Sequence, residues 1–66
     1  MKVTANGDDV ELPEGATVVD LLTALGIGTR GVIVERNGEP VLRTAMQGTV
    51  LSHGDRIELV RAVAGG

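Results

Sequence analysis

The chain contains no cysteine and no phenylalanine, tyrosine or tryptophan, and its only histidine is His53. Without cysteine it can form no disulfide, no thiol nucleophile and no thiolate zinc site, and one histidine cannot make a histidine cluster. The lack of aromatic rings removes the surfaces on which single-stranded nucleic acids stack. Composition therefore excludes thiol catalysis, cysteine-ligated zinc and recognition of nucleic acid by aromatic stacking.

The chain is also short and has few charges that would attract an anionic polymer. Its 66 residues allow one domain, and a domain of this size buries only about 60% of the surface of its unfolded chain. A deep active-site cleft would compete with the core for the same residues, so we predict that the protein is not an enzyme. A net charge of −3 opposes binding to phosphate backbones and favours a protein partner with basic patches.

Long apolar segments are missing as well. The first residues, Met1–Thr4, do not resemble the start of a secretory signal. No apolar run approaches the roughly 20 residues that cross a bilayer. These features predict a cytoplasmic protein with no membrane partner, and we expect it to be a monomer when free.

Alternating apolar residues predict strands at residues 2–5, 10–12, 32–36 and 56–63, with Ile57 and Leu59 pointing inward. A further short strand near residues 41–42 follows Pro40, which favours the edge of a sheet. The Asn-Gly pairs at 6–7 and 37–38 are strong hairpin signals. Residues 44–49 are predicted to be a loop, residues 50–51 to return to the core, and residues 52–55 to form a turn before the last strand.

One helix is predicted to begin at Thr17, with Asp20 completing its N-terminal cap and Gly26 ending it. Its apolar stripe consists of Val18, Leu21, Leu22 and Leu25. The order of elements is therefore ββαβββ, and a single helix covering one face of a sheet is an α+β arrangement.

Three groups of residues have the composition of chemical sites but the wrong context. Residues 26–31, GIGTRG, fit a dinucleotide-binding pattern, but here a helix precedes the pattern and a strand follows it. Ser52, His53 and Asp55 are the residue types of a hydrolase triad, yet near neighbours in a turn cannot readily aim at one another. Asp8, Asp9, Glu11 and Glu14 lack the spacing of a calcium loop. We interpret these groups as a helix-to-strand connection, a turn and a solvated face.

The C-terminal Gly65-Gly66 is the strongest functional feature. Glycine supplies 10 of the 66 residues, so two terminal glycines have a chance probability of about 2%. Without Cβ atoms the chain can thread a narrow channel, and the terminal carboxylate is left unhindered. We predict a domain at residues 1–63 and a flexible tail at residues 64–66 that includes Ala64. Val60, Ala62 and Val63 are predicted to give either an apolar docking surface beside this tail or ordinary strand packing.

Several segments together resemble the sulfur carriers of thiamine biosynthesis, the ThiS family of β-grasp, ubiquitin-like proteins. The similar segments are VTANG at residues 3–7, GATV at 15–18, Leu21-Leu22, VIV at 32–34, Asn37-Gly38, GDRIELV at 54–60 and AVAGG at 62–66. The resemblance covers essentially the whole chain and implies a mixed sheet of about five strands with one main helix on one face. It also implies an aromatic residue in the loop where this chain has Ala45-Met46, and often a larger side chain at Val60.

The resemblance further implies a cycle of reactions at Gly66. An adenylating enzyme would use its own ATP and magnesium to activate the Gly66 carboxylate, and a sulfur-donor protein would convert the adenylate to a thiocarboxylate. Thiazole synthase would then take the sulfur for the thiazole of thiamine. The carrier itself would bind no cofactor and perform no catalysis.

Other functions remain open from the sequence. Carriers for molybdopterin or cysteine synthesis share the fold and a similar tail, although they are usually longer. A ubiquitin-like modifier would be conjugated to other proteins through Gly66. A plain interaction module that binds through a sheet edge would not need Gly65 or Gly66 at all.

Overall fold

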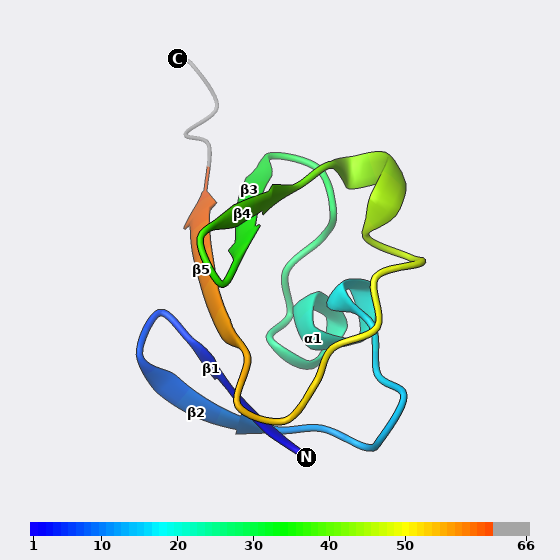
Figure 1. Cartoon of the computed structure of the whole chain (residues 1–66). Helices are drawn as coiled ribbons and strands as arrows, with labels where there is room; N and C mark the ends of the chain where they lie inside the picture. Colours follow the sequence, from blue (N-terminus) through cyan, green and yellow to red (C-terminus); the bar gives the residue numbers. More distant parts are fainter. Residues whose placement is uncertain (62–66) are drawn as a thin grey trace.

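The computed structural model describes residues 1–61, which form a sheet, one α-helix and one 3-10 helix (Figure 1). The elements follow in the order β1 (Lys2–Ala5), β2 (Asp8–Glu11), α1 (Val18–Ala24), β3 (Val32–Arg36), β4 (Glu39–Val41), η1 (Arg43–Ala45) and β5 (Arg56–Arg61). In space the strands lie in the order β2-β1-β5-β3-β4. The strands β1 and β5 are parallel, and the other neighbours are antiparallel. The predicted mixed sheet with five strands is confirmed for these residues.

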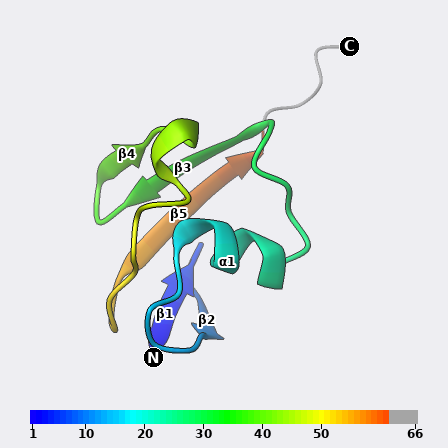
Figure 2. The ribbon, with the colours of Figure 1, turned by 90° about the vertical axis from the view of Figure 1, so that its right-hand side faces the viewer.

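The helix α1 covers one face of the sheet, and the core lies between the two layers (Figure 2). Every second residue of β1, β3 and β5 points toward the helix, which supplies its own buried stripe. The buried apolar side chains are Val3, Ala5, Leu12, Ala16, Val18, Leu21, Leu22, Val32, Val34, Met46, Leu51, Ile57 and Leu59. The prediction that Ile57 and Leu59 face inward is confirmed. Leu25, which was predicted to belong to the apolar stripe, is instead the C-cap residue of α1 and is 38% exposed.

Both ends of α1 have the caps that the sequence predicts. The Thr17 backbone N–H donates to the Asp20 carboxylate at 2.8 Å, and the Asp20 N–H donates back to the Thr17 hydroxyl at 3.3 Å. At the other end Gly26 has φ +72°. The Ile27 N–H donates to the Leu22 carbonyl at 2.8 Å, which closes a Schellman motif.

The two Asn-Gly turns explain where the strand predictions were wrong by a few residues. Asn6 and Gly7 both have positive φ, as do Asn37 and Gly38, and two such residues in a row make the tight turn whose twist matches that of a hairpin. Pairing therefore starts directly after each turn, so β2 begins at Asp8 and β4 at Glu39. The predictions had placed these strands at residues 10–12 and 41–42.

The segment between β4 and β5 also differs from the prediction of a plain loop. It contains η1, and after it Met46 is only 1% exposed. Residues 50–51 return to the core through Leu51 alone, since Val50 is 53% exposed. The flexible Met46 side chain thus fills the interior from a loop in which the resemblance implies an aromatic ring.

We expect Met46→Ala to lower the free energy of unfolding by about 2–4 kcal/mol, because it removes a fully buried side chain and leaves a cavity. Urea denaturation followed by circular dichroism measures the change. Met46→Leu, which nearly conserves the volume, should cost less than about 1.5 kcal/mol. Equal stability of the alanine variant and the wild type would show that the Met46 side chain does not support the core.

Candidate partner-binding site at the end of β5

The strand β5 lies in the middle of the sheet and carries the chain toward its C-terminus. It is bonded to β1 on one side and to β3 on the other. Arg61, its last residue, pairs with Val32, the first residue of β3. We call this end of the sheet the exit end. The predicted strand at residues 56–63 is confirmed through Arg61, whereas Ala62, Val63 and the predicted tail, Ala64, Gly65 and Gly66, lie outside the described residues.

Two asparagine side chains hold β5 in place by mimicking strand pairing. The Leu59 N–H donates to the Asn6 side-chain oxygen at 2.7 Å, and the Asn6 amide donates to the Leu59 carbonyl at 3.0 Å. At the start of the strand, the Arg56 N–H donates to the Asn37 side-chain oxygen at 2.8 Å. The residues that make the tight turns therefore also fix the backbone of the strand that leads to the tail.

Asp55 is the buried polar centre that anchors the start of β5. Its carboxylate accepts from Arg36 Nε at 2.8 Å, from the Asn37 amide at 2.9 Å and from the Ser52 N–H at 2.8 Å. Burial by itself raises the pKa of Asp55, but the hydrogen bonds from Ser52, Asn37 and Arg36 and the charge of Arg36 together lower that pKa below its ordinary value. The carboxylate is therefore held ionised and fully bonded.

This network also settles how the triad-like residues are used. The Asp55 carboxylate is occupied by three donors, while His53 Nδ1 accepts from the Lys2 N–H at 3.0 Å. Gly54, with φ +88°, makes the turn between them. The interpretation of residues 52–55 as a turn is confirmed. Residues 26–31 likewise connect α1 to β3, as their order in the chain predicts.

The face of the sheet opposite α1 presents an apolar pair near the exit end. Ile33 on β3 and Val60 on β5 are directly paired across the strands and are 58% and 59% exposed. We call these two residues the outer patch. Val60 is thus not core packing, which was one of the two predicted interpretations. Its partner Ile33 was not predicted, although the alternation in Val32-Ile33-Val34 already places it on the same face as Val60.

The described residues provide neither a metal-binding cluster nor a membrane-spanning helix. Among residues 1–61, no group of three or more histidine, cysteine, aspartate or glutamate side chains is arranged to hold a metal ion. No helix in that part of the chain has the length and apolar character needed to cross a membrane.

The strand order, the parallel central pair and the single covering helix define a β-grasp domain whose last strand, β5, lies at the centre of the sheet. The chain belongs to the ThiS family, whose family model matches residues 2–66. The crystal structure of the thiamine biosynthesis protein ThiS from Geobacter metallireducens is 35% identical, with a TM-score of 0.81 and full coverage of both chains. A solution structure of a thiamine biosynthesis protein from the same organism is 36% identical, with a TM-score of 0.80, and covers 100% of this chain and 88% of that one.

A relative of a different size is also similar over the whole of this chain. It is a protein named thiazole synthase from Paramagnetospirillum magneticum, 36% identical over 66 residues. The present chain spans 20% of the length of that relative.

Proposed function

We propose that the protein is a sulfur carrier of thiamine biosynthesis whose Gly66 carboxylate is activated by a separate adenylating enzyme. The observation that carries the proposal is the ThiS family match, which runs through the Gly-Gly end. The similar structures of thiamine biosynthesis proteins from Geobacter metallireducens support the same pathway. The carrier itself is not an enzyme in this proposal, and it works in the cytoplasm.

The proposed chemistry begins because a carboxylate is a poor electrophile. An oxygen of the Gly66 carboxylate attacks the α-phosphorus of ATP, which the partner binds with magnesium, and pyrophosphate leaves. Hydrosulfide, delivered by the sulfur donor, then attacks the acyl carbon of the adenylate, AMP leaves, and a thiocarboxylate remains on Gly66. Because glycine has no Cβ atom, the two C-terminal glycines give the chain a cross-section narrow enough to enter a channel that leads to the enzyme's active site.

The thiazole synthase relative supports the identity of the enzyme that takes the sulfur. A stretch similar to this entire chain forms one fifth of that protein. A protein of that name that contains a carrier-like stretch brings donor and acceptor into one molecule, where the effective concentration of one for the other is high. We propose that the present chain supplies its sulfur to a thiazole synthase as well.

Activity with the adenylating enzyme tests the proposal. Radioactive pyrophosphate should exchange into ATP only when the carrier is present, since the first step is reversible before sulfur arrives. If an enzyme known to be active on another ThiS protein gives no exchange with this chain, the proposal is wrong. Isopeptide conjugates of Gly66 in cell extract, without any thiocarboxylate, would favour the protein modifier instead.

The outer patch is proposed to bind the adenylating enzyme while the tail is in its active site. We expect Val60→Ser to raise the KM for the carrier about ten-fold, because burial of a valine side chain contributes about 1.5–2 kcal/mol. Steady-state pyrophosphate release measures the KM. Val50→Ser is the matched control, since Val50 is 53% exposed but lies in the loop before β5. Equal KM values for the two variants would contradict a docking role for the outer patch.

A further inference from the structure

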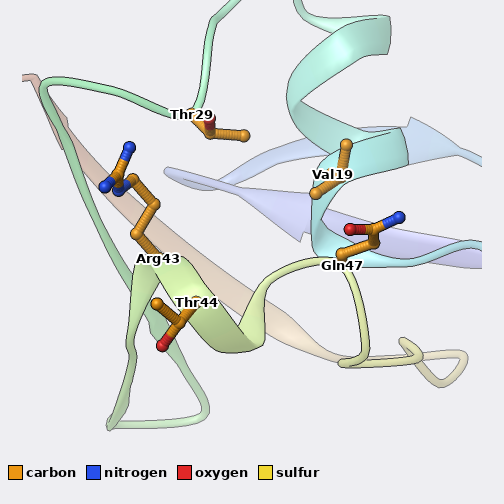
Figure 3. Close-up of a pocket in the computed structure, with 5 residues that line it drawn as sticks. All are labelled: Val19, Thr29, Arg43, Thr44 and Gln47. Atoms are coloured by element: carbon orange, nitrogen blue, oxygen red, sulfur yellow. The ribbon is translucent and has the colours of Figure 1, made fainter.

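A cleft of about 440 Å³ opens on the other side of the molecule from the outer patch, between α1 and η1 (Figure 3). It is lined by Val19 of α1, Thr29 of the α1–β3 connection, Arg43 and Thr44 of η1, and Gln47. The guanidinium group of Arg43 points toward the segment that carries Thr29. Residues of α1, of the connection that follows it and of η1 therefore line one cleft that contains a single cationic side chain.

The charge of Arg43 is not neutralised within residues 1–61. The ion pairs of that part of the chain are Lys2–Asp9, Arg36–Asp55 and Arg56–Glu58. Among residues 1–61 no carboxylate lines the cleft, and its other polar side chains include the hydroxyl of Thr29 and the amide of Gln47. Each of these groups can donate a hydrogen bond, so the cleft offers the planar, positively charged guanidinium group of Arg43 and neutral hydrogen-bond donors. That combination suits a carboxylate.

The cleft also lies toward the exit end. Thr29 is three residues before Val32, which pairs with the last residue of β5. In both ribbon views η1 lies at about the level of the end of β5 (Figures 1 and 2). Arg30, directly after Thr29, is exposed and adds a second positive charge to the α1–β3 connection. An enzyme that binds the tail therefore comes within reach of this cleft.

The surroundings of Arg43 favour a protein side chain over a small anion. Leu42, immediately before Arg43, is 70% exposed. A single exposed arginine is a weak site for a free anion, whereas an arginine beside an exposed aliphatic residue is typical of the anchors of protein interfaces. The occupant should therefore be a carboxylate that a folded partner holds next to an apolar contact.

We propose that the Arg43 cleft receives an aspartate or glutamate side chain of the adenylating enzyme when that enzyme takes the tail. This inference rests on the proposed function, in which that enzyme is the first to find the free carrier by diffusion. A charge-complementary contact beside the tail speeds such encounters and fixes the orientation of the carrier. Together with the outer patch, this contact lets the enzyme bind both the helical layer and the sheet of the domain at the exit end.

The test compares Arg43→Glu with Lys2→Glu, which makes the same change of net charge at the start of β1, away from the exit end. Arg43→Glu should raise the KM for the carrier at least about ten-fold and leave kcat within about two-fold. The KM of Arg43→Lys should lie between that of Arg43→Glu and that of the wild type, because lysine keeps the charge but loses the bidentate geometry of the guanidinium group. Lys2→Glu should behave as the wild type.

Direct binding of each carrier to the adenylating enzyme without ATP, by calorimetry, tests the cleft independently of turnover. If the wild type binds but supports no pyrophosphate exchange, the proposed function fails while the effect of Arg43→Glu on binding still tests the cleft. If exchange is normal and Arg43→Glu binds as tightly as Lys2→Glu, the cleft proposal alone fails. It fails too if the variant binds only thiazole synthase less tightly, or if inorganic phosphate shifts the Arg43 NMR signals at millimolar concentration.

Discussion

Deletion of Gly66 is expected to slow carrier-dependent pyrophosphate release at least about 100-fold and to stop thiocarboxylate formation. The deletion shortens the reach of the chain by up to about 3.5 Å, and a misplacement of only about 1 Å at a reacting atom can cost a factor of about 100. The new C-terminal carboxylate on Gly65 would be chemically the same group in the wrong place. Rapid-quench measurement of pyrophosphate with saturating ATP gives the rate.

The deletion should leave the domain intact, which makes the result interpretable. The buried core and the hydrogen bonds that hold β5 are formed among residues 1–61. Urea midpoints of the deleted and full-length chains should therefore agree. A deleted chain that is folded and still releases pyrophosphate at the wild-type rate would mean that Gly66 is not the activated residue.

The second large effect is expected from Asp55→Asn, which should lower the free energy of unfolding by about 2–3 kcal/mol. An asparagine there has one acceptor oxygen, so its amide must face one of the donors that now bond the carboxylate. Asn37 cannot readily turn around to help, because its own oxygen accepts from Arg56. The loss is large because Asp55 is only 7% exposed, and unpaired buried donors are costly. The loss of stability is limited because the Arg36 side chain is partly exposed, so solvent weakens its ion pair with Asp55.

The pH dependence of the free energy of unfolding is a second, independent test of the role of Asp55. Because folding lowers the pKa of Asp55, its ionised form stabilises the native state fully above the ordinary aspartate pKa. That stability is lost as the pH falls through the lowered pKa of the folded protein. Below about pH 4 the wild type should therefore lose its advantage over Asp55→Asn.

Asp9→Asn is the control for loss of one carboxylate. Asp9 faces Lys2 at 3.7 Å in an exposed pair, so its removal should change stability by less than about 0.5 kcal/mol. If Asp55→Asn proves as stable as Asp9→Asn at neutral pH, the network does not anchor β5.

Much of the fold could be predicted because local signals and the global arrangement agree. The two Asn-Gly turns, the capping residues Thr17 and Asp20, and Gly26 each specify backbone geometry within a few residues. The first residues of β2 and β4 were missed because hydrophobic alternation is a weak guide in strands with charged or proline residues. The turns themselves contained the answer, since pairing begins directly after them.

The burial of Met46 and the hydrogen-bond network of Asp55 could not be predicted from short-range sequence patterns. Met46 follows a 3-10 turn, where neither period 2 nor period 3.6 applies. Asp55 bonds partners 18 and 19 residues earlier in the chain, so its role depends on how β3 and β5 pair. The Arg43 cleft likewise exists only because η1 and the α1–β3 connection meet in space.

The proposed chemistry at Gly66 was inferred from the residues of the tail and from the resemblance, and the described residues add the surroundings of the strand that leads to it. They show that β5 is held on both sides and by two asparagines. They also include an exposed apolar pair on β3 and β5 and an arginine cleft between α1 and η1. We propose these two features as docking surfaces for the enzyme that acts on the tail.

Intact-mass spectrometry of the full chain, after incubation with its adenylating enzyme, ATP, magnesium and a sulfur donor, shows whether Gly66 carries the sulfur. We expect a mass gain equal to the exchange of one oxygen for one sulfur, located by fragmentation at Gly66 and absent when ATP is omitted. An unchanged mass with an adenylating enzyme that is active on another ThiS protein, or sulfur located anywhere but Gly66, would contradict it.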